Sequence, residues 1–153
     1  MSVREEITCI KITVPGRPVP KARARTVRLK GGRSVSFTPD KTAAWELKIQ
    51  AAAMEVRPEK LWDEPLRMTT EYILQRPKSK PKRVQHPATK PDLDNLDKSV
   101  KDALEGLIYT NDSRIVESRY CKRYGEPERV EITISRADMH RGRMVKGGLM
   151  ASE

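Results

Sequence analysis

The chain has 153 residues and carries 31 Lys and Arg against 21 Asp and Glu, which gives a formal net charge of +10. This length fits a single domain with one core and excludes a second full domain. No apolar stretch approaches the ~20 residues of a membrane span, residues 1–6 lack the apolar core of a signal peptide, and the two histidines are too few for a zinc site.

These properties predict a cytoplasmic protein that is attracted to polyanions through counterion release. Cys9 and Cys121 lie in apolar, strand-like surroundings, which indicates reduced, buried thiols. Neither a membrane partner nor a small-molecule cofactor is expected.

The first predicted element is a strand over residues 7–14, in which the even positions Ile10, Ile12 and Val14 are apolar and Lys11 and Thr13 are polar. Residues 17–37 follow, a segment rich in Pro, Gly and basic side chains that indicates a long basic loop or a loose hairpin. Three of its bases could neutralise phosphates of a nucleic acid: Lys21, Arg23 and Arg25.

A helix is predicted next, with Thr38 as its N-cap, Pro39 in its first turn and its end before Pro58. Apolar residues recur within it at helical spacing: Ala43, Leu47, Ala51 and Met54. Residues 66–74 then alternate as in a half-buried strand, with apolar side chains at Leu66, Met68, Tyr72 and Leu74.

Residues 76–90 contain three prolines and can neither pair continuously nor form a helix, so we expect a mobile basic loop. The loop lacks aromatic residues to stack bases, which favours contact with a duplex backbone over a single strand. Its candidate DNA-binding residues are Arg76, Lys78, Lys80, Lys82 and Arg83.

A second helix is predicted after the loop, with Asp94 or Asn95 as N-cap, Gly106 near its end and one apolar stripe formed by Leu96, Val100, Ala103, Leu104 and Leu107. Two more strands follow, over residues 115–122 and around Ile132, and residues 136–153 lack periodicity and form a basic, disordered tail. The predicted fold is α+β, a single compact domain over residues 1–135 with a small mixed sheet of about four strands packed with two helices.

The segment 90–98 places three acids, Asp92, Asp94 and Asp97, in an otherwise basic chain, which indicates a cation site beside an anion-binding surface. If residues 92–94 are extended, Asp92 and Asp94 share one face. Two such carboxylates suit Mg²⁺ or Mn²⁺, which keep waters for substrate phosphates. Lys98 lies one helical turn beyond Asp94 and could contact a scissile phosphate. The alternative is that the acids only cap a helix or form solvated ion pairs, and we prefer this interpretation for Asp97.

Four ordered motifs resemble the RusA family of Holliday-junction resolvases. They are residues 15–23 (PGRPVPKAR), residues 37–42 (FTPDKT), the segment 92–106 that contains DLDNL and DALEG, and Asn111-Asp112. The similarity covers about residues 7–135.

The resemblance implies an intertwined homodimer of bacterial or phage type that uses Mg²⁺, with Mn²⁺ as a substitute, to cut four-way DNA junctions by paired incisions. Asp92, Asp94 and Asp112 would bind the metal, and Lys98 would be the catalytic lysine. The family often has two adjacent acids where this chain has Asn111-Asp112, so only Asp112 can be a charged ligand there.

Geometry raises a question about Asp112. A helix over residues 95–107 spans roughly 18 Å, and five extended residues reach at most ~17 Å. Either the chain returns almost directly, or the helix ends early, or a partner subunit supplies Asp112.

Two other functions remain open from the sequence. One is a nuclease with broader substrate specificity, which cuts flaps, forks or other branched DNA. The other is a non-catalytic, basic DNA-binding protein.

Overall fold

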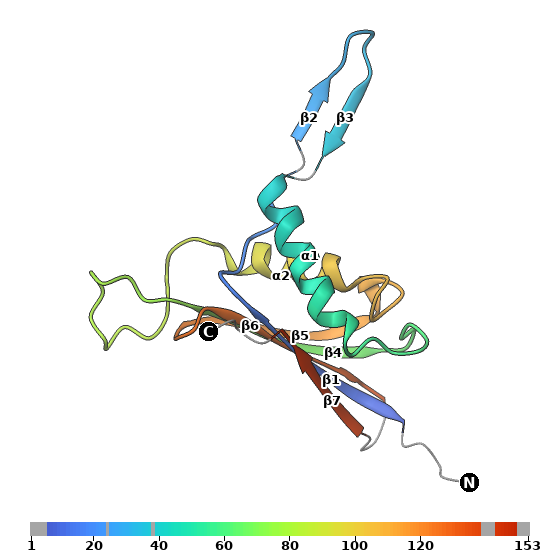
Figure 1. Cartoon of the computed structure of the whole chain (residues 1–153), viewed down its shortest axis with the longest axis vertical. Helices are drawn as coiled ribbons and strands as arrows, with labels where there is room; N and C mark the ends of the chain where they lie inside the picture. The colour runs from blue at the N-terminus through green and yellow to red at the C-terminus, as the bar shows by residue number, and fades with distance from the viewer. Residues whose placement is uncertain (1–5, 24, 38, 139–142, 150–153) are drawn as a thin grey trace.

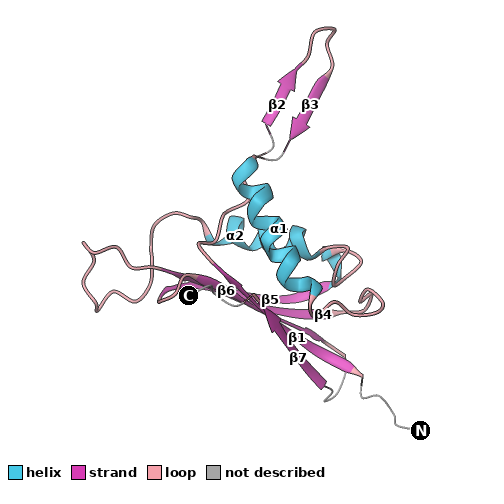
Figure 2. Cartoon of the chain, in the orientation of Figure 1, coloured by secondary structure: helices cyan, strands magenta, loops and turns pink. Residues whose placement is uncertain are grey.

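The computed structural model describes residues 6–23, 25–37, 39–138 and 143–149. A five-stranded sheet in the order β5-β4-β6-β1-β7 forms its base, and two helices cover one face of this sheet (Figures 1 and 2). The elements are β1 (Ile7–Pro15), β2 (Arg25–Arg28), β3 (Ser34–Phe37), α1 (Asp40–Met54), β4 (Leu66–Leu74), α2 (Leu93–Leu104), a 3-10 turn (Asp112–Arg114), β5 (Ile115–Tyr124), β6 (Arg129–Arg136) and β7 (Arg143–Gly148).

The sheet is mixed, as predicted, because β4 pairs parallel with β5 and β1 parallel with β7, whereas β6 runs antiparallel to both β1 and β4. Consequently β1, β4 and β5 all end at the same edge of the sheet. The α+β class and the single domain are confirmed, and the sheet has one strand more than expected.

The additional strand is β7, which lies in the segment predicted to be a disordered tail. Its residues pair with β1 from Ile7 to Thr13 and include Gly147, whose missing Cβ leaves room for the Val56 side chain. The segment forms a strand because it pairs with β1, which lies more than 130 residues away in sequence. Its own weak periodicity does not predict this pairing. Residues 139–142 and 150–153 lie outside the described residues.

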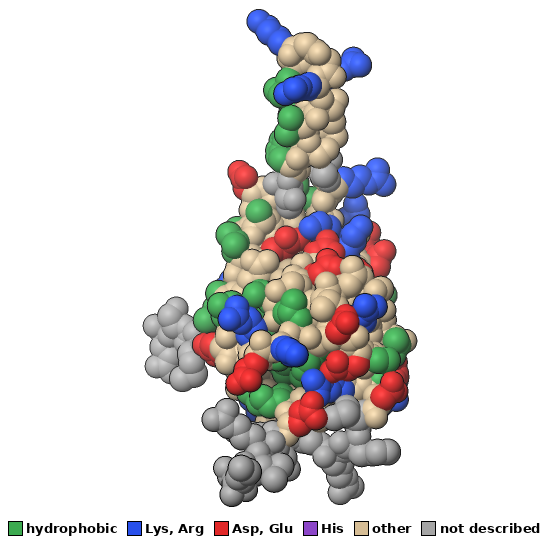
Figure 3. Space-filling model, turned by 90° about the vertical axis from the view of Figure 1, so that its right-hand side faces the viewer, with side chains coloured by type: hydrophobic (Ala, Val, Ile, Leu, Met, Phe, Trp, Pro, Cys, Tyr) green, Lys and Arg blue, Asp and Glu red, His purple; other side chains and the backbone are tan. Residues whose placement is uncertain are grey.

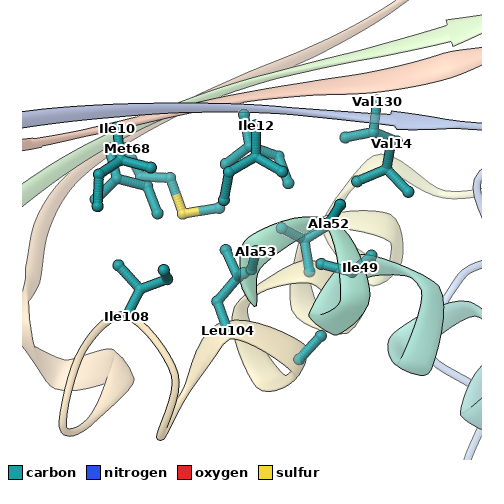
Figure 4. Close-up of a cluster of buried hydrophobic side chains, with 14 of the residues drawn as sticks. Ile10, Ile12, Val14, Ile49, Ala52, Ala53, Met68, Leu104, Ile108 and Val130 are labelled. Carbon is teal, nitrogen blue, oxygen red and sulfur yellow. The ribbon is translucent and has the colours of Figure 1, made fainter. Parts of the chain in front are cut away.

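The core lies between the helices and the sheet (Figure 4). The alternating strands contribute as predicted, with Ile10, Ile12 and Val14 of β1 fully buried. In α1 the predicted stripe is wrong, because the buried side chains are Thr42, Trp45, Ile49, Ala52 and Ala53. Leu47 is 65% exposed and Met54 51% exposed. Both faces of α1 carry apolar residues, and the face with the larger Trp and Ile side chains buries more area against the sheet.

Strands β2 and β3 form a separate hairpin, which we call the arm (residues 25–37). It continues from the N-terminal end of α1 and projects away from the sheet and helices (Figure 1). The prediction of a basic loop or loose hairpin is thus confirmed in its second form. The thiols differ from expectation, since Cys9 is only half-buried and Cys121 is exposed on β5. None of the described helices is long and apolar enough to span a bilayer.

Candidate active site

The acidic run begins α2. Asp92 occupies the N-cap position in extended conformation, and the helix starts at Leu93, earlier than predicted. The expected extended geometry of residues 92–94 is therefore wrong, because Pro91 restricts only the residue before it. Asp92 and Asp94 are both exposed, and the Asp92 side chain makes no capping hydrogen bond. The two carboxylates are thus free for a ligand at the same end of the helix.

Lys122 fixes the backbone that leads into Asp92. Its Nζ donates to the carbonyl oxygen of Thr89 at 2.6 Å and to that of Pro91 at 3.0 Å. Lys122 lies near the end of β5, at the sheet edge where the loop after β4 also departs. The structure thus gives this lysine a contact inside the protein.

The N-terminal basic motif packs against the same helix end. The Lys21 backbone N–H donates to the Asn95 carbonyl oxygen at 2.8 Å. Its Nζ lies 2.6 Å from Glu46 Oε1 and 3.1 Å from Asp102 Oδ2. Burial acts to lower the pKa of Lys21, but the hydrogen bonds and charges of Glu46 and Asp102 outweigh it and raise the pKa. Lys21 therefore joins the motif to α1 and α2, and its charge is already compensated.

An open hollow of about 430 Å³ lies where these segments meet. Basic side chains and one acid, Asp92, face it together. Its lining residues are Arg17, Pro18, Pro20, Lys21, Lys90, Pro91, Asp92 and Asn95.

Asp97 and Lys98, adjacent in sequence, point to different environments. Asp97 is 3% exposed, accepts a hydrogen bond from the Tyr72 hydroxyl at 2.9 Å and lies 2.8 Å from Lys101 Nζ. Burial and the Asp97 charge raise the pKa of Tyr72 above its usual range. Asp97 thus has a structural role, but in a buried network and not in the solvated pair that the sequence suggested. Lys98 is exposed on α2.

Asp112 lies at the other end of α2. Its backbone N–H donates to Glu105 Oε1 at 3.3 Å, just beyond the last residue of the helix. Strand β5 starts shortly after Asp112, and its Lys122 contacts Pro91, the residue before Asp92. Residues 115–122 are extended at ~3.3 Å per residue, so the Asp112 end of α2 and the Asp92 end lie roughly 23 Å apart. The helix does end early, at Leu104, yet one chain does not bring Asp112 to Asp92.

Asn111 has a local task at this second end. Its side-chain oxygen accepts a hydrogen bond from the Ser113 N–H at 2.9 Å and caps the 3-10 turn. Nearby, Asp63 accepts hydrogen bonds from the Thr110 hydroxyl and from the Arg114 guanidinium, which together lower the pKa of its carboxyl group. The turn that carries Asp112 is therefore fixed by its neighbours.

The basic loop after β4 contains neither helix nor strand, as predicted. Arg76 is partly used within the loop, because its Nε donates to the Val84 carbonyl oxygen and its guanidinium lies over the Tyr124 ring. The other candidates differ in exposure, with Lys80 half-buried and Lys78, Lys82 and Arg83 exposed. Arg23 lies just before the arm and is exposed, and Arg25 begins β2.

Within the described ranges, no group of three or more His, Cys, Asp or Glu side chains could hold a metal ion. The pair Asp92 and Asp94 nevertheless fits Mg²⁺, which proteins often bind through one or two carboxylates while substrate phosphates and water complete the shell. Sequence reasoning found these acids, but it missed the roles of Lys122, Glu46 and Asp102, which arise only from contacts between distant segments.

The family described as "Endodeoxyribonuclease RusA" matches residues 15–135. The chain belongs to the RusA family. A Bacillus subtilis (strain 168) protein named "Uncharacterized protein YqaN" is 36% identical over 136 residues, which cover 82% of this chain and 95% of that protein. Membership of the RusA family indicates endodeoxyribonuclease activity of the Holliday-junction resolvase type.

Proposed function

We propose that this RusA-family protein is a Mg²⁺-dependent endonuclease that resolves four-way DNA junctions by paired incisions near the branch point, in recombination and repair. The observation that carries the proposal is the pair of exposed carboxylates, Asp92 and Asp94, beside a basic hollow. Asp92 occupies a capping position without using its side chain to cap, which argues against the non-catalytic interpretation.

The residues would divide the work as follows. Asp92 and Asp94 would hold the metal, which when bound would polarise the phosphodiester and activate a water, with Mn²⁺ able to substitute. Lys98, exposed one turn further along α2, would stabilise charge on the scissile phosphate. Exposed Lys and Arg side chains of the loop after β4 would bind the flanking DNA backbone.

Asp112 would complete the site only across a homodimer. Two observations support this arrangement: Asp112 and Asp92 lie at opposite ends of α2, and α1 leaves Leu47 and Met54 exposed on the face away from the core. In such a dimer, each metal site combines Asp92 and Asp94 of one subunit with Asp112 of the other.

The first experiment incubates the protein with a labelled immobile four-way junction, a flap, a fork and a matching duplex, with Mg²⁺ or with EDTA. We expect symmetric nicks at the branch point that EDTA abolishes and that Asp94→Asn loses while DNA binding persists. Cleavage that is indifferent to EDTA would refute the mechanism. Equal rates on flaps, forks and junctions would instead support the broader branched-DNA nuclease.

A second experiment tests the shared site by co-expressing Asp92→Asn and Asp112→Asn subunits. With Asp112 acting across the dimer, the mixed dimer has one intact site and one doubly altered site, so single-strand nicking returns. The matched control pairs Asp92→Asn with Asp94→Asn, in which neither site is intact and nicking stays absent. If Asp112 acts within its own subunit, the first pair is as inactive as the control.

A further inference from the structure

The arm is a two-stranded sheet that is separate from the five-stranded sheet. Among the described residues its strands pair only with each other, from Arg25 with Phe37 to Arg28 with Ser34. A two-stranded hairpin is at best marginally stable by itself in water, and it gains stability when one face packs against something. A ligand that packs against one face of the arm would therefore stabilise it.

The two faces of the arm differ in chemistry. Val27 pairs directly with Val35, and alternation places Leu29 and Phe37 on the same face, each side chain being 44–48% exposed. The opposite face is polar, with the Thr26 and Ser36 hydroxyls 3.3 Å apart. Figure 3 shows the hydrophobic side chains gathered along one side of the arm.

The positive charge on and around the arm favours a polyanion as its ligand. No Asp or Glu occurs between Glu6 and Asp40, and exposed basic side chains lie just before the arm and within it: Arg23, Arg28, Lys30 and Arg33. The last two flank the Gly31-Gly32 turn at the tip, where Figure 3 shows Lys and Arg side chains. Such a surface attracts a polyanion such as DNA.

We infer that the arm is a DNA-binding element that recognises the branch point, an inference that rests on the proposed function. Its apolar face, which includes Leu29, would cover the faces of base pairs at the branch. The Lys and Arg side chains at its tip would contact phosphates. A continuous duplex presents polar base edges and phosphates to a protein, whereas a branch point can be opened, and opening it unstacks base pairs and exposes apolar base faces that the arm would cover. Aliphatic side chains inserted at base steps are an established way of binding distorted DNA.

The test compares two triple variants of the full chain. The face variant, Val27→Thr/Leu29→Thr/Val35→Thr, removes apolar groups while preserving strand propensity. The matched control, Thr26→Ala/Ser34→Ala/Ser36→Ala, changes the opposite face. Both are assayed for cleavage of the junction and for binding to the matching duplex, with 2-aminopurine beside the branch reporting unstacking through its fluorescence. Thermal unfolding checks that the body is intact.

We expect wild type and control to raise the 2-aminopurine signal at the junction and the face variant to lose most of this rise. Junction cleavage by the face variant should fall by about tenfold or more, because base unstacking costs a few kcal/mol that the apolar face no longer offsets. Duplex binding should change less than about twofold, since backbone charge supplies most of that affinity.

Three results would overturn the inference while leaving the proposed function in place. In the first, the face variant keeps the fluorescence rise and the wild-type preference for junctions. In the second, the control loses as much activity as the face variant. In the third, light scattering shows that the face variant alone dissociates, which would make the arm a contact between subunits. A wild type that cuts no DNA would instead refute the proposed function.

Discussion

Lys122 offers the sharpest test of how the fold positions the acidic run. Its ammonium group holds the carbonyl oxygens of Thr89 and Pro91, within the three residues before Asp92, so Lys122→Met removes both hydrogen bonds while preserving most of the aliphatic side chain. We expect Asp92 to lose its fixed position and junction cleavage to slow, whereas DNA affinity changes little.

The expected magnitude follows from the two hydrogen bonds. A hydrogen bond to a charged group contributes about 1.5–3 kcal/mol when shielded, and Lys122 is only half-buried, so the lower figure applies to each bond. If about half of the combined ~3 kcal/mol acts on the position of Asp92, cleavage falls roughly tenfold, since 1.4 kcal/mol is a factor of ten in rate.

The assay is single-turnover cleavage of a four-way junction at saturating protein over a range of Mg²⁺ concentrations. Lys122→Met should need more Mg²⁺ and reach a lower rate, and Lys122→Arg, which keeps a donor, should recover part of it. Lys60→Met is the matched control, because it removes an exposed charge from the segment between α1 and β4, which contacts neither carbonyl. The reasoning would be refuted if Lys122→Met followed the wild-type Mg²⁺ curve, or if its only defect were weaker DNA binding.

Three further predictions concern stability and DNA binding. Asp97→Ala leaves Lys101 without its buried partner, so urea unfolding should show a destabilisation of about 3 kcal/mol, whereas Asp102→Ala, at a more exposed carboxylate, should cost less. A second variant replaces three exposed basic residues of the loop after β4 with Gln: Lys78, Lys82 and Arg83. The slope of log affinity against log salt should fall in magnitude by about 0.9 for each phosphate that the protein no longer neutralises. An unchanged slope would exclude the loop from the DNA-binding surface. The lowered pKa of Asp63 means that its contribution to stability is complete above its ordinary value of 3.8 and disappears as the pH falls through the folded-state value. Asp63→Asn should therefore flatten thermal stability against pH in the acid range only, and parallel curves for wild type and variant would contradict this.

The strands and the second helix were predictable because their periodicity directly reflects burial. In β1 the alternation of Ile10, Ile12 and Val14 with polar residues corresponds to one face on the core, and in α2 the stripe from Leu96 to Leu104 does the same. The stripe of α1 was wrong because apolar residues occur on both of its faces. Strand β7 was missed because what defines it is pairing with β1 and not a pattern of its own.

The sequence by itself made the two carboxylates and Lys98 candidates for the site, because acids crowded into a basic chain and the ordered motifs around them are local signals. Only the tertiary structure decided which charges are available. It buries Asp97 against Tyr72, pairs Lys21 with Glu46 and Asp102, and sets Lys122 behind Asp92. It also places Asp112 at the far end of α2. These outcomes depend on contacts between segments that are distant in sequence, and such contacts leave no periodic trace in the chain.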